Sequence, residues 1–320
     1  MTASAKLDHA LLAGILHRQQ GVIARGQVIR CGMTERALLY RIRPGGSWQR
    51  LLPGVYLAET GTSTTDQRDL AALLYAGPGS VITASAAMRR LGLRTPSTSD
   101  VDVLVPAAMQ RQSLSFVKLH RTTRMPDLFC VSGPIRFAMA PRAVADAARG
   151  LKDLREVRAV VAGSVQQDWC RIAELAKELD EGPMPGSARF RRVLAEVAVG
   201  VRSPAEAEFC DLLISAGLPM PMFNARLYIG DVLIAIADAW WPDAGIAAEV
   251  DSRAWHLSAE DWEQTLQRHA LMTAKGILVL HFTPKQVRTE PAYVITTLRA
   301  ALDAGRNASR LRVRALPATA

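Results

Sequence analysis

Carboxylate side chains stand out in two neighbouring apolar segments near the C-terminus. Asp238 follows the run Val-Leu-Ile-Ala-Ile-Ala, while Glu249 and Asp251 close the run Ile-Ala-Ala-Glu-Val-Asp. The four residues between the segments, 242–245, read Pro-Asp-Ala-Gly, which is a composition typical of a tight turn. We therefore expect the two segments to pair as an antiparallel hairpin.

The register of this hairpin decides whether the carboxylates meet. Pairing Trp241 with Ile246 across the turn places Asp238 opposite Glu249, with Cβ atoms about 4.5–5.5 Å apart. Asp251 lies two residues further on and therefore shares a face with Glu249. Like charges this close need a counter-charge, and Mg²⁺ (or Mn²⁺) is the usual one because it prefers oxygen ligands. The sequence thus predicts Asp238, Glu249 and Asp251 as metal ligands.

Helices and further strands are predicted to position this hairpin. Ser203 has the features of a helix N-cap, with Pro204 at the first helical position and Glu206 at the third, which together make a capping box. After the hairpin we expect a helix over 258–275, a strand over 277–282 and a final helix. The expected order is helix, three strands, helix, strand, helix.

Residues 203–300 resemble the restriction-endonuclease-like (PD-(D/E)xK) superfamily, and look closest to its branch similar to very-short-patch-repair endonucleases. The Lys that is usual in the superfamily is absent, and Asp251 occupies its place. The resemblance rests on these residues and motifs: Glu206, Asp238, Glu249, Asp251, Trp255, His256, Arg268 and the run Val279-Leu-His-Phe282.

This resemblance implies metal-dependent hydrolysis of DNA phosphodiesters. Asp238 and Glu249 would hold Mg²⁺, which polarises the scissile phosphate and lowers the pKa of a bound water. His256 could act as general acid or base, because the pKa of imidazole is ordinarily near neutrality. Asp251 could be a further ligand or could orient His256. A retained fold with an inactive site is the alternative.

Other residues of the same stretch have two readings each. Glu206 could reach the metal through water or could only cap its helix. Trp255 could stack on a base or be buried in the core. Arg268 and His269, on the predicted helix, could contact phosphate, whereas His281, inside a strand, is expected to be a core residue.

Residues 7–58 have the pattern of a small winged helix-turn-helix. Helices are expected over 7–20 and 25–31, and a third over 35–43 with Thr34 as its N-cap. Two short strands around Pro53-Gly54 would form the wing.

The third helix of this segment carries the candidate DNA contacts. Arg36, Tyr40 and Arg43 fall away from its apolar face and could read base edges, since Arg suits guanine. Arg41 and Arg50 are expected to contact phosphates. Together with Thr34 at the helix start, they are the candidate DNA-binding residues, to which Trp255 and Arg268 are added. The alternatives are a solvated helix face and a winged helix used for protein contact.

The N-terminal segment, with its Leu-Pro-Gly-Val-Tyr motif, resembles the N-terminal domain of AbiEi-type antitoxins of abortive-infection toxin–antitoxin systems. The likeness continues weakly through 62–150, in Ser-Ala-Ala-Met-Arg-Arg-Leu-Gly-Leu and Ala-Pro-Arg-Ala-Val-Ala-Asp-Ala-Ala. It implies transcriptional autorepression of an operon and a cognate toxin protein as partner. In that middle region His120 has no evident partner, and we expect it to be structural.

The charge of the chain is unevenly distributed, which bears on the DNA-binding hypothesis. The chain has 320 residues, 49% of them hydrophobic, and a net charge of +9. Residues 1–60 hold eight Lys and Arg against three Asp and Glu (+5), and residues 201–300 hold eight against twelve (−4). A basic N-terminal segment suits double-stranded DNA, although an ordinary Arg-rich surface would give the same total.

We expect a mixed α/β (α+β) protein. The domains are placed at 1–60 (winged helix-turn-helix), 61–181 (small α/β and helical), 182–310 (restriction-endonuclease-like) and 311–320 (tail), with 181–187 as linker. No apolar run reaches the roughly 18 residues that a membrane span needs, and the N-terminus lacks a signal peptide, so a cytoplasmic location is expected. The scattered cysteines predict reduced thiols. A homodimer remains open, and so does processing of RNA or a repair intermediate.

Overall fold

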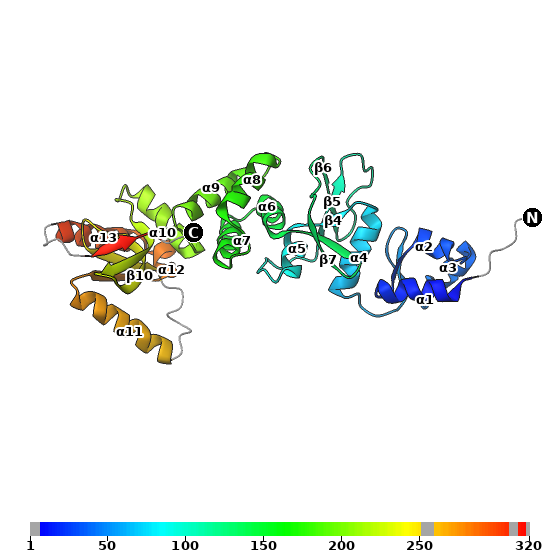
Figure 1. Cartoon of the computed structure of the whole chain (residues 1–320), viewed down its shortest axis with the longest axis horizontal. Coiled ribbons are helices and arrows are strands. Elements are labelled where there is room, and N and C mark those ends of the chain that lie inside the picture. Colours follow the sequence, from blue (N-terminus) through cyan, green and yellow to red (C-terminus); the bar gives the residue numbers. More distant parts are fainter. Residues whose placement is uncertain (1–6, 251–258, 307–312, 318–320) are drawn as a thin grey trace, which may run out of the picture. The chain divides into compact units, whose positions relative to one another are not determined.

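The computed structural model describes residues 7–250, 259–306 and 313–317. These residues form a mixed α/β protein with thirteen helices and three β-sheets (Figure 1), which confirms the expected class. The chain divides into two compact units, of which the first contains Met1–Gly150 with Lys177–Met184 and the second Leu151–Ala176 with Pro185–Ala320.

The first unit begins with a helical segment closed by a small antiparallel sheet. Its sheet has the order β1-β3-β2, in which the two strands around Pro53-Gly54 were predicted and β1, between the first two helices, was not. The elements are α1 (His9–Arg18), β1 (Val22–Ala24), α2 (Arg25–Arg30), α3 (Glu35–Arg41), β2 (Gln49–Leu52) and β3 (Val55–Leu57). The core between them contains Leu12, Ile23, Val28, Leu38 and Trp48.

Two helices of this segment end earlier than predicted. The first stops at Arg18, because Gln20 and Gly21 have φ angles of 50° and 81°, which a right-handed helix excludes. The third stops at Arg41, and Ile42, with φ −94° and ψ 4°, is its C-cap. Arg43 therefore lies just beyond the helix, in the turn that leads to β2.

The rest of the first unit is a five-stranded mixed sheet with helices. The strand order is β6-β5-β4-β8-β7, in which β4 is parallel to β8 and β5 to β6. The short strands β4, β7 and β8 are not in the predicted set. The elements are α4 (Thr65–Ala76), β4 (Val81–Ile82), α5 (Ala84–Arg90), β5 (Val101–Pro106), β6 (Val117–Thr122), β7 (Phe129–Ser132), β8 (Ile135–Ala138) and α6 (Ala140–Gly150).

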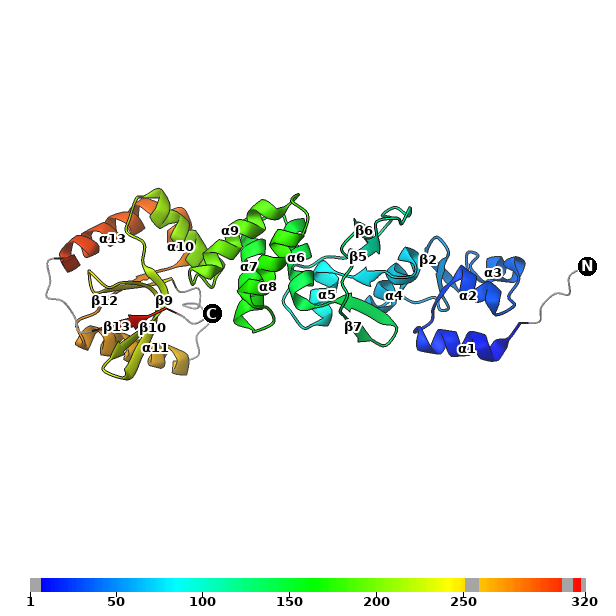
Figure 2. The same ribbon diagram turned by 45° about the horizontal axis from the view of Figure 1, so that its top comes forward.

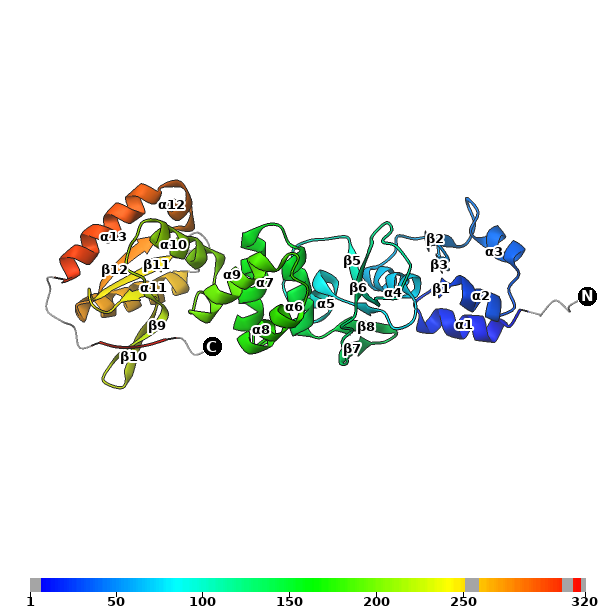
Figure 3. The ribbon, with the colours of Figure 1, turned by 90° about the horizontal axis from the view of Figure 1, so that it is seen from above.

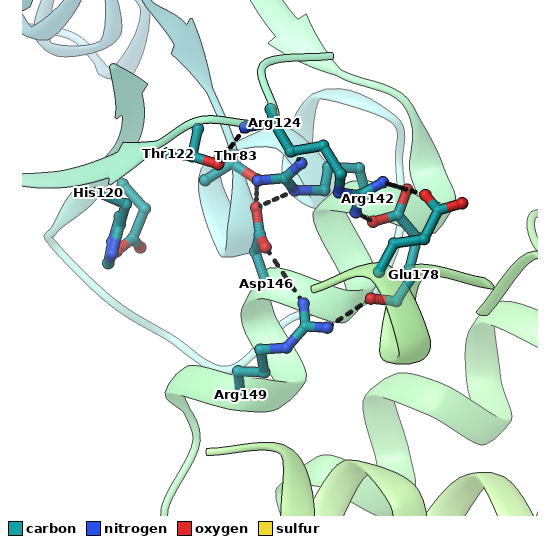
Figure 4. Close-up of polar contacts among 10 residues, drawn as sticks. Thr83, His120, Thr122, Arg124, Arg142, Asp146, Arg149 and Glu178 are labelled. Atoms are coloured by element: carbon teal, nitrogen blue, oxygen red, sulfur yellow. Dashed lines mark hydrogen bonds and ion pairs between the residues drawn. The ribbon is translucent and has the colours of Figure 1, made fainter. Parts of the chain in front are cut away.

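A buried polar network holds the end of α8 (Ile172–Glu181) against α6 (Figure 4). Asp146 Oδ2 accepts hydrogen bonds from Thr83 Oγ1 at 2.7 Å and from Arg142 Nε at 2.8 Å. Arg149 lies 3.5 Å from Asp146 Oδ1 and donates to the backbone carbonyl of Glu178. These contacts explain why the last residues of α8 belong to the first unit while its first residues belong to the second.

The second unit is built around another five-stranded sheet, of order β12-β11-β10-β9-β13. Its strands are β9 (Met222–Ile229), β10 (Val232–Trp241), β11 (Ile246–Val250), β12 (Leu278–Phe282) and β13 (Arg314–Leu316). Its helices, besides the first part of α8, are α7 (Leu154–Gln166), α9 (Ser187–Ala198), α10 (Pro204–Ser215), α11 (Ala259–Ala274), α12 (Pro284–Thr289) and α13 (Pro291–Arg306). The single final helix of the prediction is two helices, α12 and α13.

Helices cover both faces of this sheet (Figure 2). On one face α10, α12 and α13 pack with Trp241, Ile246 and Phe282 in one apolar cluster. On the other face α11 contributes Met272 to a second cluster, together with Trp240. The β9–β10 hairpin projects from the sheet at its turn (Figure 3).

The register of the β10–β11 hairpin is the predicted one. Trp241 pairs with Ile246, and Ala239 pairs with Ala248. The turn contains Gly245 with a φ of 66°, which favours glycine at this place. The strand β11 continues as a neighbour of β12, to which it runs parallel.

Candidate functional site

On two neighbouring strands of the second unit, β9 and β10, the side chains change from one face of the sheet to the other at the same level. Ala237 of β10 belongs to the apolar cluster under α11, and Ala239 belongs to the cluster on the opposite face. In a regular strand, residues two apart share a face. Ala225 and Phe223 of β9, which pair with Ala237 and Ala239, are divided in the same way. On each strand, the residue that lies between these two is polar, and the two polar residues are candidate site residues.

These two polar residues are Asp238 and Asn224. Asn224 is buried and has a φ of 48°, a backbone conformation that residues other than glycine seldom adopt. Strained conformations of this kind concentrate at functional places in proteins. The change of face on the two strands, together with the unusual backbone of Asn224, therefore identifies this level of the sheet as the candidate site.

Glu206 reaches the same place from the first turn of α10. Ser203 caps this helix as predicted, because its Oγ accepts a hydrogen bond of 3.1 Å from the Glu206 amide. The reciprocal half of the predicted capping box is wrong. Glu206 Oε2 instead accepts hydrogen bonds from the amide of Arg202 at 2.9 Å and from Asn224 Nδ2 at 2.6 Å. The buried amide of Asn224 offers a donor that draws the carboxylate toward β9.

The environment of Glu206 favours its protonated form. Burial raises the pKa of Glu206 to about 7, and the negative charge of Asp238 adds to the rise. The N–H groups of Arg202 and Asn224 lower the pKa and offset part of this effect. Glu206 and Asp238 are thus close enough to repel each other, and Glu206 can take up or release a proton near neutral pH.

Asp238 and Glu249 occupy the next positions after the Ala239–Ala248 pair on their two strands. Asp238 is half-buried, and its Oδ2 accepts a hydrogen bond of 2.8 Å from the amide of Val250. The carboxylate thus reaches across to the end of β11, where Glu249 lies. The paired register ends at the Ala239–Ala248 pair, and the Asp238 side chain turns toward the β11 backbone.

Glu249 is 5% exposed, and its side chain approaches Arg268 on α11. Its Oε2 lies 3.6 Å from Nη2 of Arg268, so an arginine partly neutralises the carboxylate. In β12, His281 is the register partner of Glu249, and its ring lies 4.2 Å from the ring of His269, measured between centroids. The prediction of His281 as a core residue is wrong: it is exposed, because β12 is the edge strand of the sheet.

The donor set suits Mg²⁺ chemically. Carboxylate oxygens are its preferred protein ligands, and a cation would compensate the negative charge of Asp238, which adds to the effect of burial on the pKa of Glu206. Among residues 7–250, 259–306 and 313–317, no group of three or more His, Cys, Asp or Glu side chains is placed to hold a metal ion. The predicted site residues Asp251, Trp255 and His256 lie outside the described residues.

The candidate DNA-contacting residues of the first unit lie on and after α3. Thr34 is the N-cap, and its Oγ1 accepts a hydrogen bond of 3.2 Å from the amide of Ala37. Arg36 and Tyr40 are exposed on the helix, Tyr40 with 62% of its surface accessible. Arg50 is exposed on β2.

Two arginines of this group stack on aromatic rings. The guanidinium of Arg43 lies 3.7 Å from the centroid of the Tyr40 ring, and that of Arg41 lies 5.3 Å from the Trp48 ring. Such cation–π contacts orient the guanidinium groups. Arg41 is half-buried and Trp48 is in the core, so Arg41 is the less available of the two.

Several contacts were not predicted from the sequence. Asn224 is the one polar residue in Met-Phe-Asn-Ala, and this break in an apolar run is the signal that could have found it. The prediction that His120 has no evident partner is wrong, because its Nε2 lies 2.7 Å from Oδ1 of Asp102. The parallel register pairs His120 with Leu104, which places Asp102 at a diagonal position.

The helices of the described residues are all too short or too polar to cross a membrane. No protein-family model matches the sequence. The chain is 26% identical over 278 residues to uncharacterized protein MT2308 of Mycobacterium tuberculosis (strain CDC 1551 / Oshkosh), and equally to uncharacterized protein Rv2248 of strain ATCC 25618 / H37Rv. Each alignment covers 86% of this chain and 100% of the relative, so the similarity runs through both units.

Proposed function

We propose that this chain is a DNA-binding protein whose residues 7–58 form a winged helix-turn-helix. In this proposal α3 enters the major groove and the β2–β3 hairpin is the wing. The order of elements and the three-stranded sheet β1-β3-β2 support it. So do the exposed arginines of this segment, because basic side chains that remain accessible can contact the DNA backbone and bases.

The contacts divide by their position. Arg36 and Tyr40 on α3 are assigned to base edges, since residues on the recognition helix face the groove, and Arg43, which follows the helix and stacks on Tyr40, is assigned with them. Arg41 and Arg50 are assigned to phosphates, which position the protein without reading the sequence. The stacking of Arg43 on Tyr40 supports its assignment, because a guanidinium held over a ring is already oriented for binding.

For the second unit we propose a restriction-endonuclease-like domain that hydrolyses DNA phosphodiesters with Mg²⁺ or Mn²⁺. Asp238 and Glu249 would hold the cation, with Asp251 as a further ligand and Glu206 beside them. Such a cation supplies charge stabilisation at the phosphate and lowers the pKa of a bound water. His256 remains the candidate proton donor or acceptor, and Trp255 and Arg268 the candidate DNA contacts.

One observation carries the nuclease proposal: Asp238 and Glu249 each lie one position beyond the Ala239–Ala248 pair, on the side away from the turn, and Asp238 accepts a hydrogen bond from the amide next to Glu249, that of Val250. The test is nicking of supercoiled plasmid with Mg²⁺ or Mn²⁺. Loss of activity is expected in Asp238→Asn and Glu249→Gln. Asp243→Asn is the matched control, because Asp243 is exposed in the turn of the same hairpin and should be dispensable. Nicking that persists in both site variants would refute the proposal.

The ion pair between Arg268 and Glu249 favours a second candidate, an AbiEi-like antitoxin or transcriptional repressor whose nuclease-like domain is inactive. A repressor of this kind would bind the promoter of its own operon and interact with a toxin encoded beside it. Its test is a gel shift with that promoter. Binding that is lost in Arg36→Ala and Arg43→Ala, with no cleavage by the wild type in Mn²⁺, would favour this candidate over the nuclease.

A further inference from the structure

We propose that Arg268 competes with the metal ion for Glu249, and that a DNA phosphate relieves this competition by binding the arginine. The inference rests on the proposed metal site and adds a means of regulation to it. In the absence of DNA the guanidinium would neutralise Glu249 and weaken metal binding. With DNA present, the guanidinium would move to a phosphate and leave Glu249 to the cation.

The contact between the two side chains is incomplete. The 3.6 Å between Arg268 Nη2 and Glu249 Oε2 is longer than a hydrogen bond, so the pair lacks the charge-assisted hydrogen bond that makes such pairs strong. In addition, Nε of Arg268 is buried and has no hydrogen-bond acceptor within the part of the chain that the structure describes. A buried donor without an acceptor is unfavourable. The guanidinium therefore has binding capacity that Glu249 does not use.

The burial of the two residues indicates which of them moves. Glu249 is fixed on a central strand and its side chain is 7% exposed, whereas the Arg268 side chain is 38% exposed on α11. An arginine has a long, flexible stem and can change partner without movement of the backbone. Exchange of the contact would therefore displace Arg268 and leave the carboxylate in place.

Phosphate is the ligand whose chemistry matches the guanidinium group of Arg268. A guanidinium presents its N–H donors in a planar fork that binds two phosphate oxygens at once. A phosphodiester near a metal-binding carboxylate supplies such oxygens, and the cation replaces the positive charge that Glu249 loses. The two binding events are then coupled, and by reciprocity each increases the affinity of the other by the same factor.

The experiment is calorimetric titration of Mn²⁺ into the full chain, with and without a short DNA duplex, at constant ionic strength. Arg268→Met keeps most of the apolar stem and removes the charge. Without DNA, this variant is expected to bind Mn²⁺ on the order of tenfold more tightly than the wild type, within the range usual for coupled sites. DNA should then increase the affinity clearly in the wild type and only slightly in the variant.

Two controls make the result specific. Arg288→Met removes another arginine of similar exposure (41%) that pairs with a glutamate, Glu208, and should leave Mn²⁺ binding unchanged. Glu249→Gln with DNA measures the cation that the DNA itself binds. Arg268→Gln is the second variant if Arg268→Met unfolds, as judged by circular dichroism.

The outcomes separate the inference from the metal site. If Mn²⁺ binds and Glu249→Gln abolishes binding, but Arg268→Met leaves the affinity unchanged, the inference is wrong and the metal site stands. The same holds if DNA increases the affinity equally in both proteins. If no Mn²⁺ binding that depends on Glu249 is found in any variant, with or without DNA, both the site and the inference fail.

Discussion

Asn224 donates a hydrogen bond of 2.6 Å from Nδ2 to Oε2 of Glu206, which joins β9 to the first turn of α10. The same amide group donates to the carbonyl of Gly200 at 2.9 Å, so Asn224 is held from two sides in its unusual backbone conformation. Both Asn224 and Glu206 are buried. The consequence is a carboxylate in a fixed place beside Asp238, with an affinity for protons that is unusual for glutamate.

The first prediction concerns the pH dependence of stability at Glu206. Its pKa is about 7 in the folded protein, against an ordinary value of 4.5. The folded state thus binds the proton more tightly, so the contribution to stability is complete below pH 4.5 and is lost as the pH rises to about 7. The loss is at most roughly 3 kcal/mol. Glu206→Gln, which cannot ionise, should be more stable than the wild type at pH 8.

Urea denaturation at pH 5 and pH 8, followed by tryptophan fluorescence, to which the buried Trp240 and Trp241 of the second unit contribute, measures this difference between the wild type and Glu206→Gln. Glu263→Gln is the control, because Glu263 is exposed on α11 and should change nothing. If the wild type and Glu206→Gln lost the same stability between the two pH values, Glu206 would not be the group that titrates.

The second prediction separates phosphate contacts from base contacts in the proposed DNA-binding segment. Arg50→Ala should weaken binding to all duplexes about equally and reduce the slope of log K against log salt by about 1. Arg36→Ala should cost about 1–3 kcal/mol for the preferred sequence and relax the preference. Fluorescence anisotropy with a specific and a scrambled duplex, over a series of salt concentrations, distinguishes the two.

Arg306→Ala is the control for this series, since Arg306 is an exposed arginine on α13 and lies outside the proposed DNA-binding segment. One further outcome would contradict the proposed division into phosphate and base contacts. Equal, small effects of Arg36→Ala, Arg50→Ala and Arg306→Ala would mean that the affinity comes only from net positive charge.

The elements that could be predicted are those whose signals are local. Thr34 and Ser203 cap the helices they were assigned to, and the Trp241–Ile246 register follows from a turn of fixed length. The short strands β4 and β7 could not be predicted, because two to four residues give too little periodicity. Their pairing depends on long-range contacts instead.

The geometry of the candidate site depends on contacts that no local pattern encodes. At Asn224 and Asp238 the side chains of β9 and β10 change from one face of the sheet to the other, and the residue types along the two strands do not indicate this change. The sequence likewise does not indicate the contact between Arg268 and Glu249. They meet only because α11 packs on the sheet, which is a tertiary event. The sequence alone indicates the carboxylates as candidate ligands, whereas the residues that contact them are known only from the structure.

The third prediction concerns the stacked pair Tyr40 and Arg43. The guanidinium lies 3.7 Å from the ring centroid, a contact worth about 0.5–1 kcal/mol at an exposed place. Tyr40→Ala should therefore weaken DNA binding about two- to fivefold through loss of orientation of Arg43. Tyr40→Phe keeps the ring and should retain most of the affinity, unless the hydroxyl itself contacts DNA. In an Arg43→Ala background, Tyr40→Ala should have little further effect, which a double-mutant cycle measures.

The fourth prediction concerns His120 and Asp102, on neighbouring strands of the first unit. The hydrogen bond from His120 Nε2 to Asp102 raises the pKa of the imidazole, burial lowers it, and the charge of Asp146 adds to the rise. Asp102→Asn should lower this pKa, as NMR titration of the imidazole C–H signals would measure. Because the folded-state pKa is raised, the stabilisation is present below pH 6.5 and is lost as the pH rises through the raised value. Asp100→Asn, which alters a neighbouring carboxylate that pairs with Lys118 at 3.8 Å, should leave the titration nearly unchanged. Equal shifts in both variants would mean that general negative charge, and not the hydrogen bond to Asp102, controls the imidazole.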